Sequence, residues 1–320
     1  MPNGKLLTIA EGSFDGIIEI QNSLKTSILG NDNKKYSTIF EVKKDPTNVF
    51  LIIFTESRST VNKWRVWINH FSLTKEFKPN LDIKLDNNKN YYIVIYDITP
   101  IIKNELQKYE VVVEYSGAEP LKIDNISFIS FYKINSFNTN YKLNIGKILL
   151  KSNEEIYLDS LGRNFMIAKN PNSTKMIIYY NNNESYELSG PFDNEEFEFE
   201  GSGKVKIKHD GYSNSALSII SFHTMQVKEP KIDLELNGKI VDGVLKFDII
   251  NKSEIDLDKV IINVMVNGIT QFYKVCDNVK INFYEKYEIP IKAKNGIISL
   301  RIVGVKASIR KVFEKQYKLG

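Results

Sequence analysis

Residues 196–208 read EFEFEGSGKVKIK, and this stretch decides the fold class. On both sides of Gly201-Ser202-Gly203, apolar and charged residues alternate with a period of two. That period is typical of a half-buried β-strand, whereas an amphipathic helix repeats its apolar residues about every 3.6 positions. Each flank therefore predicts a strand with one apolar face and one charged face.

The same stretch predicts how its two strands pair. A three-residue turn would place Glu198 opposite Lys206, with the other glutamates also facing lysines, and it would bury Phe197 and Phe199 on the opposite face. Cross-strand pairs of opposite charge stabilise an antiparallel pair. We therefore predict a β-hairpin over 196–208, and we interpret its acidic run as a solvated face and not as a metal site.

Strand patterns continue outward from this stretch toward the N-terminus. Eight short β-prone runs, separated by Gly, Asn, Asp and Pro, suggest a sandwich or jelly roll before residue 133. Thr99-Pro100 predicts one or two helical turns over 100–107, because proline suits the first helical position. The eight runs are 16–20, 37–42, 49–55, 64–69, 81–85, 91–97, 109–115 and 126–132.

Toward the C-terminus, Lys228-Glu229-Pro230 interrupts the strand pattern and is the expected linker. After it, 231–320 has room for about seven strands, and Asn267-Gly268 predicts a type I′ hairpin turn. The tail 308–319 fits a short helix or an edge strand. The fold class is thus all-β with three consecutive β-sandwich domains: a jelly roll over 1–133, a sandwich over 134–228 and an immunoglobulin-like sandwich over 231–320.

Composition supports this class and excludes others. The chain has 320 residues, of which 42% are hydrophobic and 26% charged, and alanine is scarce. These proportions are typical of a folded chain and argue against a helical bundle. The single Cys276 excludes an internal disulfide and a multi-cysteine zinc site. No segment has the pattern of a signal peptide or of a membrane span, so we expect no membrane insertion.

The net charge of +4 has its excess of basic residues near the C-terminus, between Arg301 and Lys318. An anion-binding tail and a solvated strand face are both compatible with this excess. The chain has no zinc finger, basic helix or aromatic-interleaved recognition motif, so no nucleic-acid partner is expected.

Two stretches resemble known families. Trp67-Ile68-Asn69, the run from Tyr96 to Ile102 and the strand 110–115 resemble jelly-roll modules beside glycoside hydrolase cores and β-sandwich domains of archaeal surface proteins, although His70 replaces their usual glycine. The stretches 243–251 and 260–268 are similar to the cell-adhesion-related (CARDB-like) immunoglobulin domain. Together these resemblances imply an accessory, adhesive or surface role, and they favour the cell surface over the cytoplasm.

Motifs of catalysis are missing from the sequence. The three histidines, His70, His209 and His223, are not at ligand spacing, and there is no nucleophile elbow, phosphate loop or dinucleotide turn. No carboxylate stands in an apolar setting that would mark it as a general acid. We expect no enzyme activity, no cofactor and no metal.

Three residues are candidate ligand contacts: Trp64, Trp67 and Asp97. The tryptophans are three positions apart on one expected strand, so they point to opposite faces. One would pack in the core, and the other would be a stacking platform for a sugar or a packing residue. Asp97 is the twelfth position of an Asn-rich stretch that begins at Asp86. Tyr91 stands where a calcium loop needs glycine, which excludes an EF-hand and leaves a looser calcium site or a simple turn.

The functional expectation follows from these patterns. The chain is expected to be a non-enzymatic binding or structural protein, a cell-surface or appendage component acting through protein partners or self-association. One alternative is a carbohydrate-binding accessory protein that binds a glycan through its first domain. The other is an enzyme with a site at a domain junction.

Overall fold

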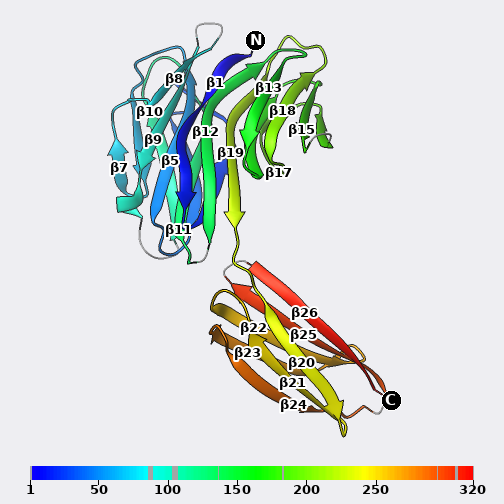
Figure 1. Cartoon of the computed structure of the whole chain (residues 1–320). Helices are drawn as coiled ribbons and strands as arrows, with labels where there is room; N and C mark the ends of the chain where they lie inside the picture. The colour runs from blue at the N-terminus through cyan, green and yellow to red at the C-terminus, as the bar shows by residue number, and fades with distance from the viewer. Residues whose placement is uncertain are drawn as a thin grey trace. The chain divides into compact units, whose positions relative to one another are not determined.

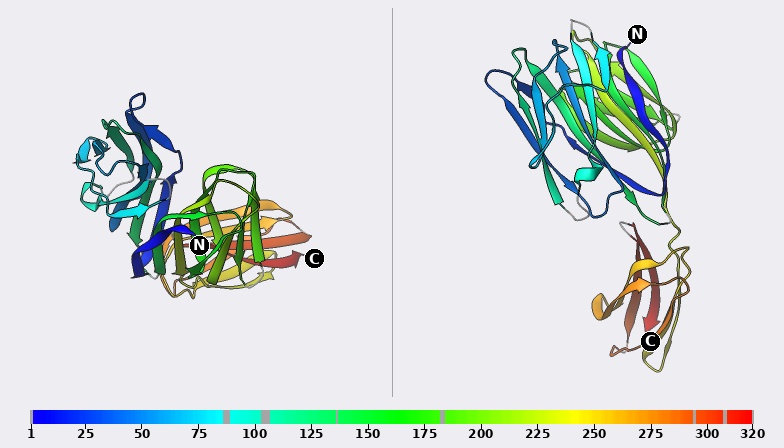
Figure 2. Two further views of the ribbon diagram at one scale, coloured as in Figure 1. Left: turned by 90° about the horizontal axis from the view of Figure 1, so that it is seen from above. Right: turned by 90° about the vertical axis from the view of Figure 1, so that its left-hand side faces the viewer.

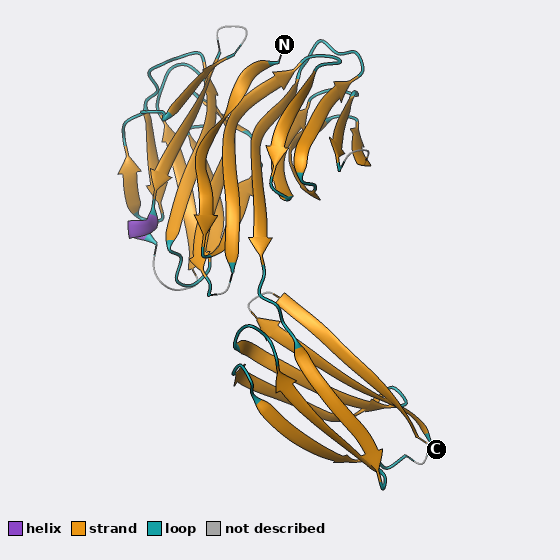
Figure 3. Ribbon diagram, in the orientation of Figure 1, coloured by secondary structure: helices purple, strands orange, loops and turns teal. Residues whose placement is uncertain are grey.

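β-Strands make up nearly all of the chain (Figure 3). The computed structural model describes residues 2–85, 89–102, 107–135, 137–181, 184–293, 295–306 and 309–319. Within those ranges the helical structure is a single 3-10 turn, η1 (Thr99–Ile101). The all-β prediction is confirmed. The chain divides into two units, Met1–Lys228 and Glu229–Gly320.

Unit 1 contains four antiparallel sheets, which we number in the order in which they pack. Sheet I is β4-β10-β6-β7, and sheet II is β2-β11-β5-β9-β8, with β3 also on β11. Sheet III is β1-β12-β19-β14-β17, and sheet IV is β13-β18-β15-β16. The strands are β1 (Asn3–Phe14), β2 (Gly16–Ser23), β3 (Ser27–Leu29), β4 (Lys35–Val42), β5 (Asn48–Ser57), β6 (Trp64–Ile68), β7 (Phe71–Thr74), β8 (Leu81–Lys84), β9 (Asn90–Asp97), β10 (Gln107–Tyr115), β11 (Leu121–Lys133), β12 (Asn138–Leu150), β13 (Glu155–Ser160), β14 (Arg163–Asn170), β15 (Lys175–Tyr180), β16 (Glu184–Ser189), β17 (Phe192–Glu200), β18 (Gly203–Asp210) and β19 (Leu217–Lys228).

Three apolar cores alternate with these sheets, so unit 1 is a stack of four layers (Figures 1 and 2). The first core joins sheets I and II and includes Phe40, Val66 and Phe128. The second joins sheets II and III, and the third joins sheets III and IV. Sheets II and III are therefore covered on both faces. This explains why their central strands, such as β11 and β19, are buried on both faces along most of their length, polar residues included.

The N-terminal strand β1 joins sheet III and not the sheets that follow it in the chain. It pairs along its length with β12, from Asn3 opposite Leu149 to Phe14 opposite Thr139. The division expected between residues 133 and 134 lies inside unit 1, and β1 crosses it. Sequence analysis placed no strand before residue 16, because the glycines and polar residues of β1 obscure its alternation.

The hairpin predicted over 196–208 is wrong, although both of its strands exist. β17 pairs with β14 in sheet III, whereas β18 pairs with β13 and β15 in sheet IV. The connection is thus an arch between two facing sheets. Glu198 forms an ion pair with Arg163, and Lys206 forms one with Glu155. Glu198 and Lys206 therefore do not face each other as the hairpin prediction required.

The apolar faces of the two strands nevertheless contribute to one core. Phe197 and Val205 are buried between sheets III and IV, and Phe199 packs against them. Alternation specifies that one face of each strand is buried, but it does not specify whether the two strands bond to each other or face each other across a core.

Unit 2 is a two-sheet sandwich. Sheet V is β20-β21-β24 and sheet VI is β23-β22-β25-β26, with one apolar core between them. The predicted Asn267-Gly268 turn is confirmed, since both residues have positive φ and Val266 pairs with Ile269. The tail forms an edge strand and not a helix. The strands are β20 (Leu234–Val241), β21 (Val244–Asn251), β22 (Leu257–Val266), β23 (Ile269–Val279), β24 (Tyr284–Pro290), β25 (Gly296–Lys306) and β26 (Ile309–Leu319).

Candidate functional site

The two tryptophans point to opposite faces of sheet I, as their spacing predicts. Trp64 is buried, its indole N–H donates to the carbonyl of Glu76 at 3.0 Å, and its ring meets Phe77 edge to face. Trp67 is half-buried on the outer face. The Arg65 guanidinium lies 5.3 Å from the Trp67 ring centre, and the Trp67 N–H donates to Glu114 at 3.3 Å. Arg65 therefore already occupies one face of the Trp67 ring.

A basic groove lies beside Trp64, and we call it the sheet I groove. It has a volume of about 790 Å³ and is lined by residues before β6, by the segment after β7 and by the end of β10. Its cationic residues are Lys34, Lys63, Arg65, Lys75 and Lys78.

The two carboxylates of this groove already have partners. Glu76 pairs with Lys78, and Glu114 accepts the Trp67 N–H. The other cations outnumber them, and the half-buried Phe77, beside the buried Trp64, provides an apolar surface in the groove. Such a surface is suited to an anionic ligand with an apolar face.

Asp97 lies at the end of β9 and shapes the chain there. One of its oxygens accepts hydrogen bonds from the Thr99 N–H at 3.0 Å and from the Thr99 hydroxyl at 2.6 Å. This is the geometry of an Asx turn. Residues 86–88, where the calcium-like stretch begins, lie outside the described residues. Across the described residues, no group of three or more His, Cys, Asp or Glu side chains could hold a metal ion.

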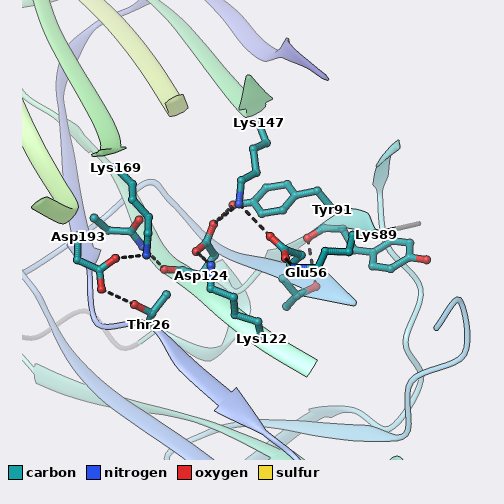
Figure 4. A network of polar contacts seen from close by, with 12 residues as sticks. Thr26, Glu56, Lys89, Tyr91, Lys122, Asp124, Lys147, Lys169 and Asp193 are labelled. Carbon is teal, nitrogen blue, oxygen red and sulfur yellow. Dashed lines mark hydrogen bonds and ion pairs between the residues drawn. The ribbon is translucent and has the colours of Figure 1, made fainter. Parts of the chain in front are cut away.

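A second site lies between sheets II and III, and we call it the buried charge cluster (Figure 4). Its centre is Lys147, whose Nζ lies 2.9 Å from Asp124 Oδ2 and 3.2 Å from Glu56 Oε2. Lys147 also lies over the ring of Tyr91, 4.4 Å from its centre, and the Tyr91 hydroxyl donates to Asp124 at 3.1 Å. The Asp124 and Lys147 side chains are 0% and 5% exposed. Burying a charged side chain costs free energy unless an oppositely charged group pairs with it. The close contacts among Lys147, Asp124 and Glu56 are therefore required for these charges to be buried here.

Two β-bulges bring the cluster together. The register of β11 against β5 shifts between Ile123 and Asn125, which leaves Asp124 at a bulge. The register of β12 against β19 shifts between Ile145 and Ile148, so Lys147 also lies at a bulge. A bulge re-aims the side chain of the extra residue. Gly146 permits the second one, because a Cβ there would lie 2.0 Å from the Lys5 carbonyl oxygen.

The electrostatics of the cluster favour the charged forms. Burial raises the pKa of the Asp124 carboxyl, but Lys147 and Lys122 outweigh burial and hold that pKa well below its usual range. Burial opposes the charge of Lys147 too, yet Asp124 and Glu56 raise its pKa. The pKa of Glu56 is lowered against its own burial, first by Lys147 and then by Lys89.

This cluster does not have the chemistry of a glycosidase site. Hydrolysis of a glycosidic bond by paired carboxyl groups needs one of them protonated as the general acid. Here both carboxyl groups are held ionised by lysines, and one ammonium group bridges them. The pair therefore lacks the proton donor that this reaction requires.

The cluster opens toward solvent through a lysine-lined groove of about 850 Å³. Four further lysines line it beside Lys147, together with Glu56 and a series of serines from the loop before β19. Their charges are largely compensated, because Lys89 contacts Glu56, Lys122 contacts Asp124 and Lys169 contacts Asp193.

Sequence analysis missed this cluster. Lys147 interrupts an apolar run, Ile145 to Leu150, whereas Asp124 lies in a mixed stretch of β11, between Lys122-Ile123 and Asn125. A charged residue inside a strand that is otherwise apolar is a signal that could have been used. What the pattern does not contain is the pair of bulges that turns both side chains toward the same point.

None of the helical structure described is long and apolar enough to cross a membrane.

Comparison with known proteins identifies no family. No family model matches the chain, and no curated protein matches it. Among solved structures, a β-glucuronidase of Ruminococcus gnavus is similar over 89% of this chain and 36% of its own, with 11% identity and a TM-score of 0.21. Bacteroides uniformis β-glucuronidase 3 is similar over 55% of this chain and 27% of its own, with 7% identity and a TM-score of 0.25. The chain thus spans about a third of the length of these enzymes or less.

Proposed function

We propose that this chain is a non-enzymatic binding protein of a cell surface or appendage, and that unit 1 binds an anionic ligand in the sheet I groove. The observation that carries the proposal is the composition of that groove: four cationic side chains besides Lys78, which pairs with Glu76, lie around Trp64 and Phe77, and the second carboxylate, Glu114, accepts the Trp67 N–H. An excess of unpaired positive charge attracts anions.

The ligand class that fits best is an acidic saccharide. Its carboxylates would pair with Lys63 and Lys75, and an apolar sugar face would pack on the half-buried Phe77. The indole of Trp64 is a wall of this site and not an open platform, since it is only 4% exposed. The first domain would thus still bind a carbohydrate, but through ion pairs with lysines and not through stacking of the sugar on a tryptophan.

Calorimetric titration of the full chain with tetragalacturonic acid, with neutral maltotetraose as the comparison, tests the proposal. We expect binding of the acidic sugar alone, with an affinity that falls as salt increases, because exposed charges are screened. Lys63→Glu combined with Lys75→Glu should weaken binding at least tenfold. Lys204→Glu, an exposed lysine of sheet IV, is the matched control and should leave it unchanged.

The results can also contradict the proposal. Binding that is equal for both sugars, or insensitive to the Lys63 and Lys75 changes, would exclude the groove. Binding of poly-glutamate without binding of the sugar would move the ligand from a saccharide to an acidic segment of a protein partner.

A further inference from the structure

The buried charge cluster places the two reactants of an amide bond in contact. Lys147 Nζ lies 2.9 Å from Asp124 Oδ2. The carbonyl carbon is one C–O bond of about 1.2 Å further, so Nζ is within about 4 Å of Asp124 Cγ. Glu56 Oε2 contacts the same nitrogen at 3.2 Å. Amine, carboxyl and a second carboxyl that can move protons thus meet at one buried point.

We propose that Lys147 Nζ and Asp124 Cγ form an intramolecular isopeptide bond, which covalently joins sheet III to sheet II, and that Glu56 is the catalytic residue that relays the proton. This modification is independent of the ligand proposed for the sheet I groove.

The reaction balances without a co-reactant. The resting state is the ion pair, and the reaction begins when a proton passes transiently from the Lys147 ammonium to Asp124 along their hydrogen bond, which gives a neutral amine and a carboxylic acid. The Nζ lone pair attacks Cγ, and Glu56 takes the next proton from the nitrogen. Glu56 then delivers that proton to the departing Asp124 hydroxyl as the C–O bond breaks. The net change is ammonium plus carboxylate to amide plus one water, with no oxidation or reduction.

The surroundings favour this reaction. Lys122 Nζ donates to Asp124 Oδ1 at 2.6 Å and would stabilise the negative oxygen of the tetrahedral intermediate, and the Tyr91 hydroxyl donates at 3.1 Å to Oδ2, the oxygen that departs as water. The contact is held by two packed sheets, which gives the proximity that makes an intramolecular step efficient. Condensation also removes two charges from an interior where ions are costly, which favours the amide over the ion pair.

Lys122 also touches Asp124, but it is a poor competitor for the bond. It lies two residues before Asp124 on the same strand and its side chain is 24% exposed, compared with 5% for Lys147. Lys147 contacts Glu56, the proposed proton relay, at 3.2 Å, whereas Lys122 meets Asp124 through the other carboxylate oxygen, Oδ1.

The intact mass of the full chain, measured after denaturation, tests the proposal. We expect the folded protein, after prolonged incubation, to be lighter than its sequence by the mass of one water. Trypsin should then release one linked species, containing residues 123–133 and 143–151, because cleavage after Lys147 is blocked. A mass equal to that of the sequence, or a loss of water located elsewhere, would overturn the proposal.

Variants assign the roles. Glu56→Gln should fold, as checked by circular dichroism, and should keep its full sequence mass, whereas Lys169→Gln, a groove lysine that pairs with Asp193, should lose one water as the unmodified chain does. Asp124→Asn is a second test that does not depend on whether the other variants fold. An amide at this position would condense with Lys147 and release ammonia, so this variant should lose the mass of one ammonia in place of one water. A folded Lys147→Arg variant that still loses water would exclude Lys147 as the amine.

Discussion

The interior between sheets II and III of unit 1 differs from the interior of unit 2. Both are layers of aliphatic and aromatic side chains between antiparallel sheets. The first also contains a lysine and two carboxylates, as well as the buried His223. In the described part of unit 2 the buried polar residues are Asn251 and Ser253, which bond to backbone groups at one end of the sandwich.

This difference indicates what each interior does. Apolar packing stabilises but is tolerant of rearrangement, whereas a buried charge requires a specific partner at a specific place. The charges between sheets II and III therefore define how the two sandwiches of unit 1 dock.

The chain offers a separate probe for each interior. Trp64 and Trp67 are the only tryptophans and both lie in unit 1, so tryptophan fluorescence follows the unfolding of unit 1. Cys276 is the only cysteine and lies in unit 2, so the rate of thiol labelling follows unit 2. The first two predictions below use both probes.

The largest effect is expected for Lys147→Met. This change leaves Asp124 and Glu56 buried without their shared partner, and it removes any covalent link at Lys147. Breaking a buried ion pair from one side costs about 3–5 kcal/mol. The denaturant midpoint followed by tryptophan fluorescence should fall, while thiol labelling of Cys276 should not change. A shift of equal size in both probes would show that the two interiors are not independent.

Leu300→Ala is the reciprocal test in unit 2. Leu300 is fully buried in the core between sheets V and VI. Truncation of a buried leucine to alanine costs about 2–5 kcal/mol through lost burial and the cavity left behind. Faster labelling of Cys276 with unchanged tryptophan unfolding is the expected outcome, and unchanged labelling would contradict the assignment of Leu300 to this core.

Acid should destabilise unit 1 before unit 2. Burial lowers the pKa of His223 from 6.5 to about 4. The unfolded state therefore binds a proton at this histidine more readily than the folded state does. The free energy of unfolding of unit 1 falls as the pH drops from about 6.5 to about 4, and below about 4 the histidine causes no further change. The shift corresponds to a loss of about 3 kcal/mol. Unit 2 has no histidine.

The control for the acid series is His223→Leu, which should remove the loss between pH 6.5 and 4 from the tryptophan signal. Asp124 and Glu56 act at lower pH, because their depressed pKa values give stability that is lost only as those carboxyl groups become protonated. An equal loss in this window in the leucine variant would point to groups other than His223.

The smallest effect compares the fully buried Tyr91 with Tyr317, a half-buried tyrosine whose hydroxyl oxygen is buried. Tyr91→Phe removes a hydrogen bond to the Asp124 carboxyl, and hydrogen bonds to charged groups contribute about 1.5–3 kcal/mol. Tyr317 of unit 2 has a buried hydroxyl without a hydrogen-bond partner, so Tyr317→Phe should be neutral or slightly stabilising. Equal losses in urea unfolding would mean that the hydroxyl of Tyr91 contributes nothing specific to the cluster.

Some parts of the structure follow directly from local pattern. Each of the eight strand runs expected over 16–132 falls on a strand, and Asn267-Gly268 forms the turn that its positive φ angles permit. The opposite orientation of Trp64 and Trp67 follows from the pleat of β6. On the other hand, only the 3-10 turn over Thr99–Ile101 represents the helix expected over 100–107, and residues 103–106 lie outside the described residues.

Other parts do not follow from local pattern. The stretch 196–208 has the same alternation whether it forms a hairpin or an arch, and the pairing of β17 with β14 and of β18 with β13 decides between them. The charge of Lys63 is visible in the sequence, but the groove around it depends on the segment after β7.

The amino-acid sequence by itself determined the all-β class, most strands and the buried face of each strand, because period-two alternation is a local property of the chain. Only the tertiary structure decided which strands share a sheet, that β1 joins β12, and that Lys147 meets Asp124 and Glu56. These depend on pairings across more than twenty residues and on two bulges, and a bulge changes the direction of a side chain without leaving a mark in the alternation around it.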